Sequence, residues 1–115
     1  MSFDDETIIA GFILNKLYLG HYFGRPNNLR HGRHTDVDNM PKGYDPKYKG
    51  IFKKVIRNIE KSGLVVVFPS AGSEHICAIL TDEAITVGLR YCNAYRKLVS
   101  LPSLDRNFKE LKNRS

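Results

Sequence analysis

The chain has few of the features that mark an exported or membrane-bound protein. Only two cysteines occur in its 115 residues, which is too few for a disulfide framework. No apolar run reaches the roughly 18 residues that a membrane-spanning helix needs. The first residues, MSFDDE, are acidic where a signal peptide is basic. The sequence therefore predicts a cytoplasmic protein with reduced thiols and no membrane contact.

Acidic residues are also scarce, and the resulting positive charge is concentrated in the middle of the chain. There are 12 Asp and Glu against 18 Lys and Arg, a formal net charge of +6. Residues 20–63 contain ten Lys or Arg against four acids, so this segment alone accounts for a net +6. The length predicts one domain, residues 1–115. A basic segment within one small domain indicates a surface patch for phosphate or another polyanion.

The spacing of apolar residues predicts an α+β protein that is mainly helical. We expect helices over residues 3–19, 46–62, 82–99 and 104–113, and a brief helix that begins at the capping box of residues 35–38 and ends near residue 40. Residues 20–34 form a predicted loop that could hold a short strand near residues 30–34. Residues 64–80 predict a β-hairpin, because two alternating apolar runs flank the turn sequence PSAGS.

The predicted helix over residues 46–62 has two chemically distinct sides. Asp45 can cap its N-terminus, Pro46 suits the first helical position, and Gly63 suits the left-handed end. One side is apolar and comprises Ile51, Phe52, Val55, Ile56 and Ile59. The other side is cationic and comprises Lys47, Lys49, Lys53, Lys54, Arg57 and Lys61. Like charges four residues apart repel each other by a few tenths of a kcal/mol, so this side indicates either an anionic partner or a solvated face.

The segment KKVIRNIEKSGLVVVFPSAGSEHICAIL, a basic helix that leads through Lys-Ser-Gly into a hydrophobic hairpin, resembles winged helix-turn-helix DNA-binding domains. The segment GRHTDVDNMPKGYDPKYKG also resembles one in small, mostly archaeal, uncharacterised winged-helix proteins. The resemblance covers roughly residues 30–80. It implies a three-helix core with a β-hairpin wing, to which the C-terminal helices are additions. It also implies that helix 46–62 enters the DNA major groove and that residues 69–74 form the wing.

The predicted function is that of a DNA-binding transcriptional regulator without enzymatic activity. The candidate contacts lie on the basic helix and in the loop before it: Lys47, Lys49, Lys53, Lys54, Arg57, Asn58, Arg30, Arg33 and Thr35. Lysine contacts to phosphate give affinity without sequence information, whereas Arg57 and Asn58 are of the types that read base edges. Two alternatives remain open, namely a winged-helix module for protein–protein interaction in a larger complex, and RNA binding.

Other classes of site have weaker support in the sequence. Potential metal ligands gather in one region: His21, His31, His34, Asp36 and Asp38. That region has no cysteine, and structural zinc sites usually include thiolates, so we expect neither a metal nor another cofactor. Cys77 and Cys92 lack a Cys-x-x-Cys pattern and are expected to be small buried residues. We expect His75 on the surface of the hairpin, and no small-molecule ligand.

The apolar positions of helix 82–99 span more than half of its circumference, which exceeds the stripe of about 100° that covering a core requires. Together with helix 104–113, this surplus predicts a homodimer that forms through the C-terminal helices. The alternative is that an extra apolar side on helix 3–19 covers it within one chain.

Overall fold

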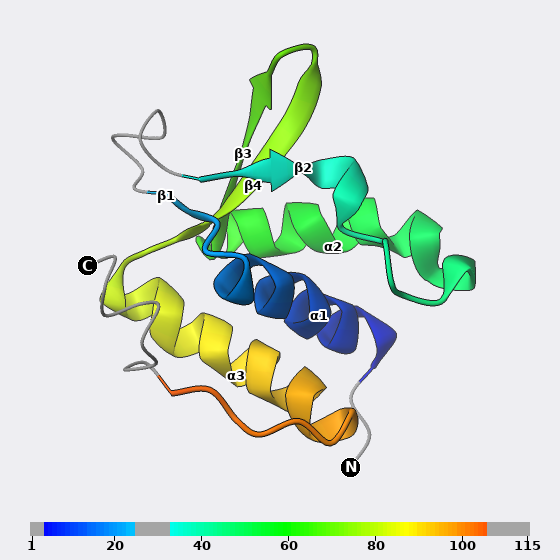
Figure 1. The fold of residues 1–115 in the computed structure, drawn as a ribbon, viewed down its shortest axis with the longest axis vertical. Helices are drawn as coiled ribbons and strands as arrows, with labels where there is room; N and C mark the ends of the chain where they lie inside the picture. Colours follow the sequence, from blue (N-terminus) through cyan, green and yellow to red (C-terminus); the bar gives the residue numbers. More distant parts are fainter. Residues whose placement is uncertain (1–3, 25–32, 106–115) are drawn as a thin grey trace.

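The computed structural model describes residues 4–24 and 33–105, and three long helices dominate this part of the chain (Figure 1). The helices are α1 (Asp5–Leu19), α2 (Lys49–Lys61) and α3 (Asp82–Leu98). The strands are β1 (Phe23–Gly24), β2 (Thr35–Asp36), β3 (Val65–Ser70) and β4 (Ser73–Ile79), and two 3-10 turns are η2 (Val37–Asn39) and η3 (Pro46–Tyr48). The predicted α+β, mainly helical class is confirmed. Within these residues, no helix has the length and apolar character needed to span a membrane.

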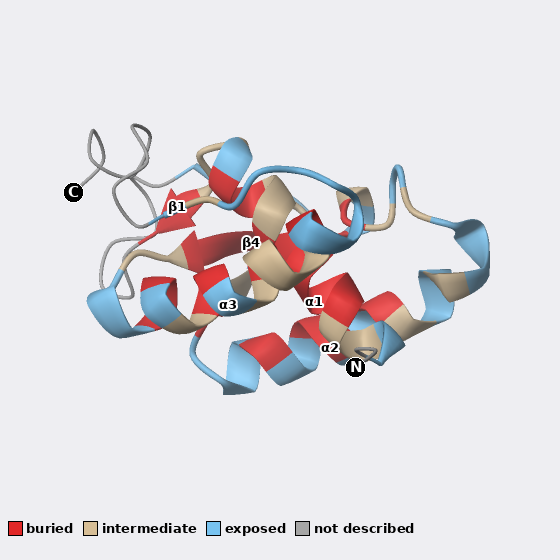
Figure 2. Ribbon diagram, turned by 90° about the horizontal axis from the view of Figure 1, so that it is seen from below, coloured by how far each residue is buried: buried red, intermediate tan, exposed pale blue. Residues whose placement is uncertain are grey.

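Helix α1 lies between α2 and α3 and is buried on most of its circumference (Figures 1 and 2). Its buried residues include the predicted core positions Ile9, Ile13 and Leu17, and also Leu14 and Tyr18 on the wider apolar side. A helix that is apolar nearly all round needs neighbours on both sides. Helix α1 has these neighbours, because α2 packs on one side of it and α3 on the other.

Close packing between α1 and α3 requires glycine at two positions. A Cβ atom at Gly11 would lie 2.7 Å from the Cβ of Tyr95 and would overlap the backbone carbonyl oxygen of Tyr91. A Cβ atom at Gly88 would overlap the hydroxyl of Tyr18. Gly11 weakens α1 by about 1 kcal/mol relative to alanine, and the structure shows that helix packing is the reason for its presence.

Strand β4 is the centre of a mixed four-stranded sheet. It pairs antiparallel with β3 along its length, from Val65↔Ala78 to Ser70↔Ser73. Its other edge is shared by β1, which is parallel, and by β2, which is antiparallel. The hairpin turn is Ala71–Gly72, with positive φ at both residues (52° and 84°), as a two-residue type I′ turn requires. The predicted hairpin is therefore confirmed.

The brief helix predicted from residue 35 is reduced to one 3-10 turn. Thr35 does not cap it, because Thr35 and Asp36 pair with Ile76 and His75 of β4 as a strand. The cap is instead Asp36, whose carboxylate accepts a hydrogen bond from the Asp38 N–H at 2.9 Å. Strand pairing with β4 thus replaces the first helical turn, and the expected second helix of a helix-turn-helix motif is only η2.

The segment after α3 differs from the predicted final helix. Leu104 and Asp105 are not helical, and residues 106–113 lie outside the described residues. The side chain of Asn93 exchanges two hydrogen bonds with the backbone of Leu104, at 2.7 and 2.8 Å. Arg96 donates from Nε to the Pro102 carbonyl at 2.6 Å and from Nη1 to the Asn15 amide oxygen at 2.8 Å. Residues 101–105 therefore fold back along α3 (Figure 1), and α3 belongs to the core.

Candidate nucleic-acid interface

The local signals around helix 46–62 act as predicted, although the helix forms in two parts. The Asp45 carboxylate accepts a hydrogen bond from the Lys47 N–H at 3.1 Å and starts η3, after which α2 runs from Lys49 to Lys61. Gly63 follows with φ at +77°. The predicted apolar side is buried at Phe52, Val55, Ile56 and Ile59. This burial fixes the rotation of α2 and turns its cationic side to solvent (Figure 2).

Four cations form an exposed row along α2: Lys49, Lys53, Arg57 and Lys61. We call them the basic row. They are spaced four residues apart, so they follow one line on the helix surface. None of them forms an ion pair with a residue that the structure describes. The row therefore has no ion pair within the described structure, although Glu60 and Glu74 line a groove beside Lys53 and Arg57.

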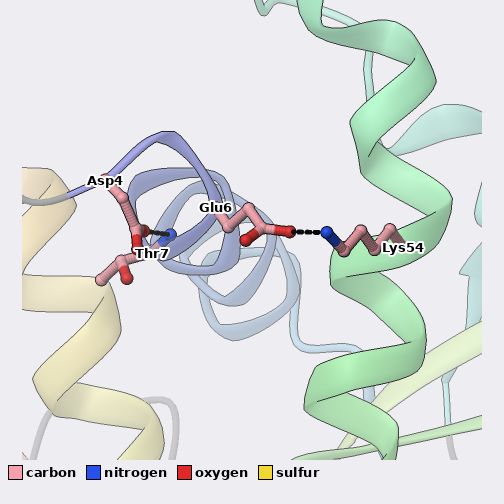
Figure 3. Close-up of polar contacts among 4 residues, drawn as sticks. All are labelled: Asp4, Glu6, Thr7 and Lys54. Atoms are coloured by element: carbon pink, nitrogen blue, oxygen red, sulfur yellow. Dashed lines mark hydrogen bonds and ion pairs between the residues drawn. The ribbon is translucent and has the colours of Figure 1, made fainter.

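Two other candidates of α2 face α1 instead. The Lys54 ammonium lies 3.0 Å from a carboxylate oxygen of Glu6, the contact drawn in Figure 3. Asn58 lines a hollow together with Asp4 and Thr7 of the first turn of α1. The pairing of Lys54 with Glu6 offsets the charge of Lys54, and Asn58 carries no charge.

A shallow groove separates the basic row from the hairpin. Its apolar lining comes from Val37, Ile56 and Val67. Its charged lining combines both signs, with Lys53 and Arg57 beside Glu60 and Glu74. The volume is about 130 Å³, well below the roughly 300 Å³ at which small-molecule sites begin. The hairpin thus contributes an acid to this groove and no cation, since residues 69–74 include neither Lys nor Arg.

The remaining candidates are dispersed. Lys47 is exposed, with its ammonium 5.0 Å from the ring centroid of Tyr48. Arg33 is exposed, with its guanidinium 5.2 Å from the ring centroid of Tyr22. The Thr35 hydroxyl accepts a hydrogen bond from the Asn39 amide at 3.0 Å, so it is engaged within the fold. Arg30 lies outside the described residues.

Lys16 positions the turn that leads into α2, a role that the sequence did not reveal. From α1, its ammonium donates to the carbonyl oxygens of Asn39 at 3.0 Å, Met40 at 3.2 Å and Lys42. Burial, and to a lesser extent the charge of Lys42, lowers the pKa of Lys16. Sequence spacing cannot find this contact, because the acceptors are backbone atoms 23 to 26 residues away.

Aromatic rings secure the N-terminal end of α2. The ring centroid of Tyr44 lies 4.8 Å from that of Phe12 in α1 and 5.5 Å from that of Phe52 in α2. Tyr48 adds an edge contact with Tyr44 at 5.7 Å. Such edge-to-face pairs stabilise by about 0.5–1.5 kcal/mol each beyond their buried area. Together with Lys16, these rings fix where the basic row begins.

The other chemically active residues do not converge on this interface. In residues 4–24 and 33–105, no three His, Cys, Asp or Glu side chains form a group suited to a metal ion. Cys77 and Cys92 are free and buried, and burial raises the pKa of each thiol to about 11. His75 is not the simple surface residue that we expected, because it is half-buried with its Nδ1 at 2.6 Å from Nδ1 of His34.

Comparison with known proteins identifies no relative: no family model matches the chain, and neither the curated proteins nor the solved structures returned a match.

Proposed function

We propose that the chain is a winged helix-turn-helix protein that binds double-stranded DNA through the basic row of α2 and acts as a transcriptional regulator. The order α1, η2, α2 and hairpin supports this fold, as does the pairing of β2 and β3 on opposite edges of β4. The observation on which the proposal rests is the exposure of the basic row without a carboxylate partner among the described residues.

An α-helix fits the major groove of B-DNA, where side chains reach base edges and phosphates. Lys49, Lys53 and Lys61 would neutralise phosphates, and Arg57 is the member of the row whose planar fork can pair with guanine. Glu74 would repel the backbone, so the hairpin would contribute less than α2. Arg33 would supply a second phosphate contact from the segment before β2.

The decisive experiment compares two double variants of equal net charge. Lys53→Ala/Arg57→Ala removes one Lys and one Arg from the basic row, and Arg90→Ala/Lys97→Ala removes the same pair from exposed positions of α3. Binding to a random-sequence duplex is measured by fluorescence anisotropy over a series of salt concentrations. We expect the first variant to lose affinity about tenfold or more and its salt slope to fall by about 1, since the lost phosphate contact of Lys53 removes about one counterion.

The Arg90→Ala/Lys97→Ala variant should retain the affinity and salt slope of the wild type. Equal losses in both variants would show that binding follows net charge and not the basic row. Wild-type protein that fails to bind duplex at low salt, or binds without salt dependence, would refute the proposal. Duplex RNA of the same sequence, as competitor, distinguishes DNA from RNA binding.

The mixed charge of the groove beside α2 favours one second candidate, a module that binds another protein. Glu60 and Glu74 would repel phosphates, whereas the apolar lining at Val37, Ile56 and Val67 suits a peptide side chain. Glu60→Gln/Glu74→Gln discriminates between the two functions. It should strengthen duplex binding if DNA is the partner, because two repulsive charges are removed, and unchanged or absent duplex binding would favour the protein partner.

We also propose that the protein forms a homodimer through the C-terminal end of α3. Most of the wide apolar face of α3 packs against α1, but Leu98, Val99 and Leu101 remain 65%, 43% and 43% exposed. Leu98→Ser/Leu101→Ser should convert a dimer to a monomer. Light scattering tests this, and a wild-type monomer at tens of micromolar would refute it.

A further inference from the structure

Two histidines from segments far apart in the sequence meet on the sheet. His34 immediately precedes β2, and His75 lies in β4 opposite Asp36. Their Nδ1 atoms are 2.6 Å apart, and their ring centroids are 4.6 Å apart. The ring of Phe68 in β3 packs edge-on against His34 at 5.0 Å between centroids. Both imidazoles are half-buried, so the contact is shielded from water on part of its surface.

The contact continues into a short polar chain. The Nε2 atom of His75 lies 3.2 Å from the Ser73 hydroxyl. A hydrogen bond from the Asp38 N–H is the main factor that lowers the pKa of Asp36, and the Ser73 hydroxyl and the charge of His75 lower it further. Asp36 therefore remains ionised through the range in which imidazoles titrate. It is a carboxylate on the same face of the sheet as His75, since the two residues are directly paired.

The charged groups around the pair cannot compensate a second imidazolium. Among the described residues, Asp36 of β2 is the acid that interacts with His75, and Glu74 precedes His75 on the opposite face of β4. Arg33 adjoins His34 with its guanidinium over Tyr22, and Lys42 also acts on Asp36. Phe68 brings no charge from β3. The surroundings of the pair thus contain one carboxylate on this face, that of Asp36, and two permanent cations in addition to the two imidazoles.

The number of protons on the pair decides whether the hydrogen bond exists. A bond between two Nδ1 atoms needs one N–H and one lone pair, which a neutral or singly protonated pair supplies. A doubly protonated pair has no Nδ1 lone pair, and it places two cations in contact. The hydrogen bond is therefore present while at least one Nδ1 lone pair remains, and acid, which protonates imidazoles, removes it.

We propose that His34 and His75 form an acid-released latch that holds β2 against β4. Strand β2 has two residue pairs with β4, Thr35↔Ile76 and Asp36↔His75, so its backbone pairing alone is short. The residue after β2 is Val37, which lines the groove beside the basic row. Release of β2 in acid loosens Val37 and with it one wall of that groove. The latch operates in the free protein, whether or not a nucleic acid is the partner.

Hydrogen–deuterium exchange of the free protein, followed by mass spectrometry at pH 7.5 and pH 5.0 and corrected for the intrinsic exchange rate, tests the latch. In the wild type we expect protection of residues 35–40 to fall about tenfold at the lower pH, the effect of losing one hydrogen bond of about 1.4 kcal/mol. Protection of α1 should not change, and this serves as the control for global unfolding. His34→Phe keeps an aromatic ring against Phe68 but cannot bind a proton, so it should show low protection at both pH values.

His21→Asn is the matched control, because it removes a histidine outside the pair, and asparagine tolerates the positive φ of 60° at this position. It should retain the pH dependence of the wild type. His75→Phe repeats the test from the other strand, should His34→Phe fail to fold. The latch is refuted if wild-type residues 35–40 keep their protection at pH 5.0, or if either phenylalanine variant loses protection on acidification as the wild type does.

Discussion

Replacing Gly11 by alanine tests the close approach of α1 and α3. The new Cβ atom would lie 2.7 Å from the Tyr95 Cβ and would overlap the Tyr91 carbonyl, which is backbone and cannot rotate away. Overpacking a core costs about 1–3 kcal/mol, and overlap with backbone belongs at the upper end of that range. The higher helix propensity of alanine offsets about 1 kcal/mol of this cost. The expected net loss in the free energy of unfolding is therefore about 2 kcal/mol.

Gly50→Ala is the matched control for this prediction. Gly50 lies in the first turn of α2, and a Cβ atom there would have no heavy atom within 4 Å. The same substitution should therefore stabilise the protein, by about 0.5–1 kcal/mol. Urea unfolding followed by circular dichroism measures both changes as shifts of the midpoint at equal slope. If Gly11→Ala is as stable as the wild type, or if the two variants shift together, the α1–α3 packing described above is wrong.

Three further predictions concern buried or half-buried polar groups. Lys16→Met should destabilise by about 2 kcal/mol, because it leaves backbone carbonyls of the turn before α2 without their charged donor; urea unfolding measures this, and an unchanged midpoint would contradict it. Arg96→Met should cost about 2–3 kcal/mol and should increase hydrogen exchange in residues 101–105, since the Pro102 carbonyl loses its donor; a fully protected segment would argue against the contact. Cys77 and Cys92 should resist thiol reagents in the folded protein, because burial raises the pKa of each to about 11. At pH 8 they should react only when urea is added, and rapid labelling of the native protein would contradict their burial.

The predictions that held are those with local causes. The Asp45 cap, the apolar spacing from Phe52 to Ile59 and Gly63 each act within a few residues, so the sequence contained all that α2 needed. The hairpin likewise follows from alternation and from a turn that tolerates positive φ. The brief helix predicted from Thr35 forms only as the 3-10 turn η2, for the opposite reason. The capping box is a local signal. Thr35 instead pairs with the backbone of β4, which is distant in sequence, and is therefore a strand residue.

The candidate site likewise has features with local causes, which the sequence predicts, and features that depend on distant residues, which it does not. The basic row was predicted from spacing alone, and burial of the apolar side of α2 exposes it. The sequence could not separate Lys54 from the row, because its partner Glu6 is on another helix. It also could not pair His34 with His75, which are 41 residues apart.

By itself, the sequence determined the helices α1, α2 and α3, the hairpin and the cationic side of α2, because caps, glycines and apolar periodicity act over one or two turns. Tertiary structure alone decided which lysine is paired, which glycines lie at close helix contacts and which histidines meet. These outcomes depend on how α1 packs between α2 and α3 and on which strands share the edges of β4. The physical reason is that such contacts join residues distant in sequence, and their energies exist only once the chain has folded.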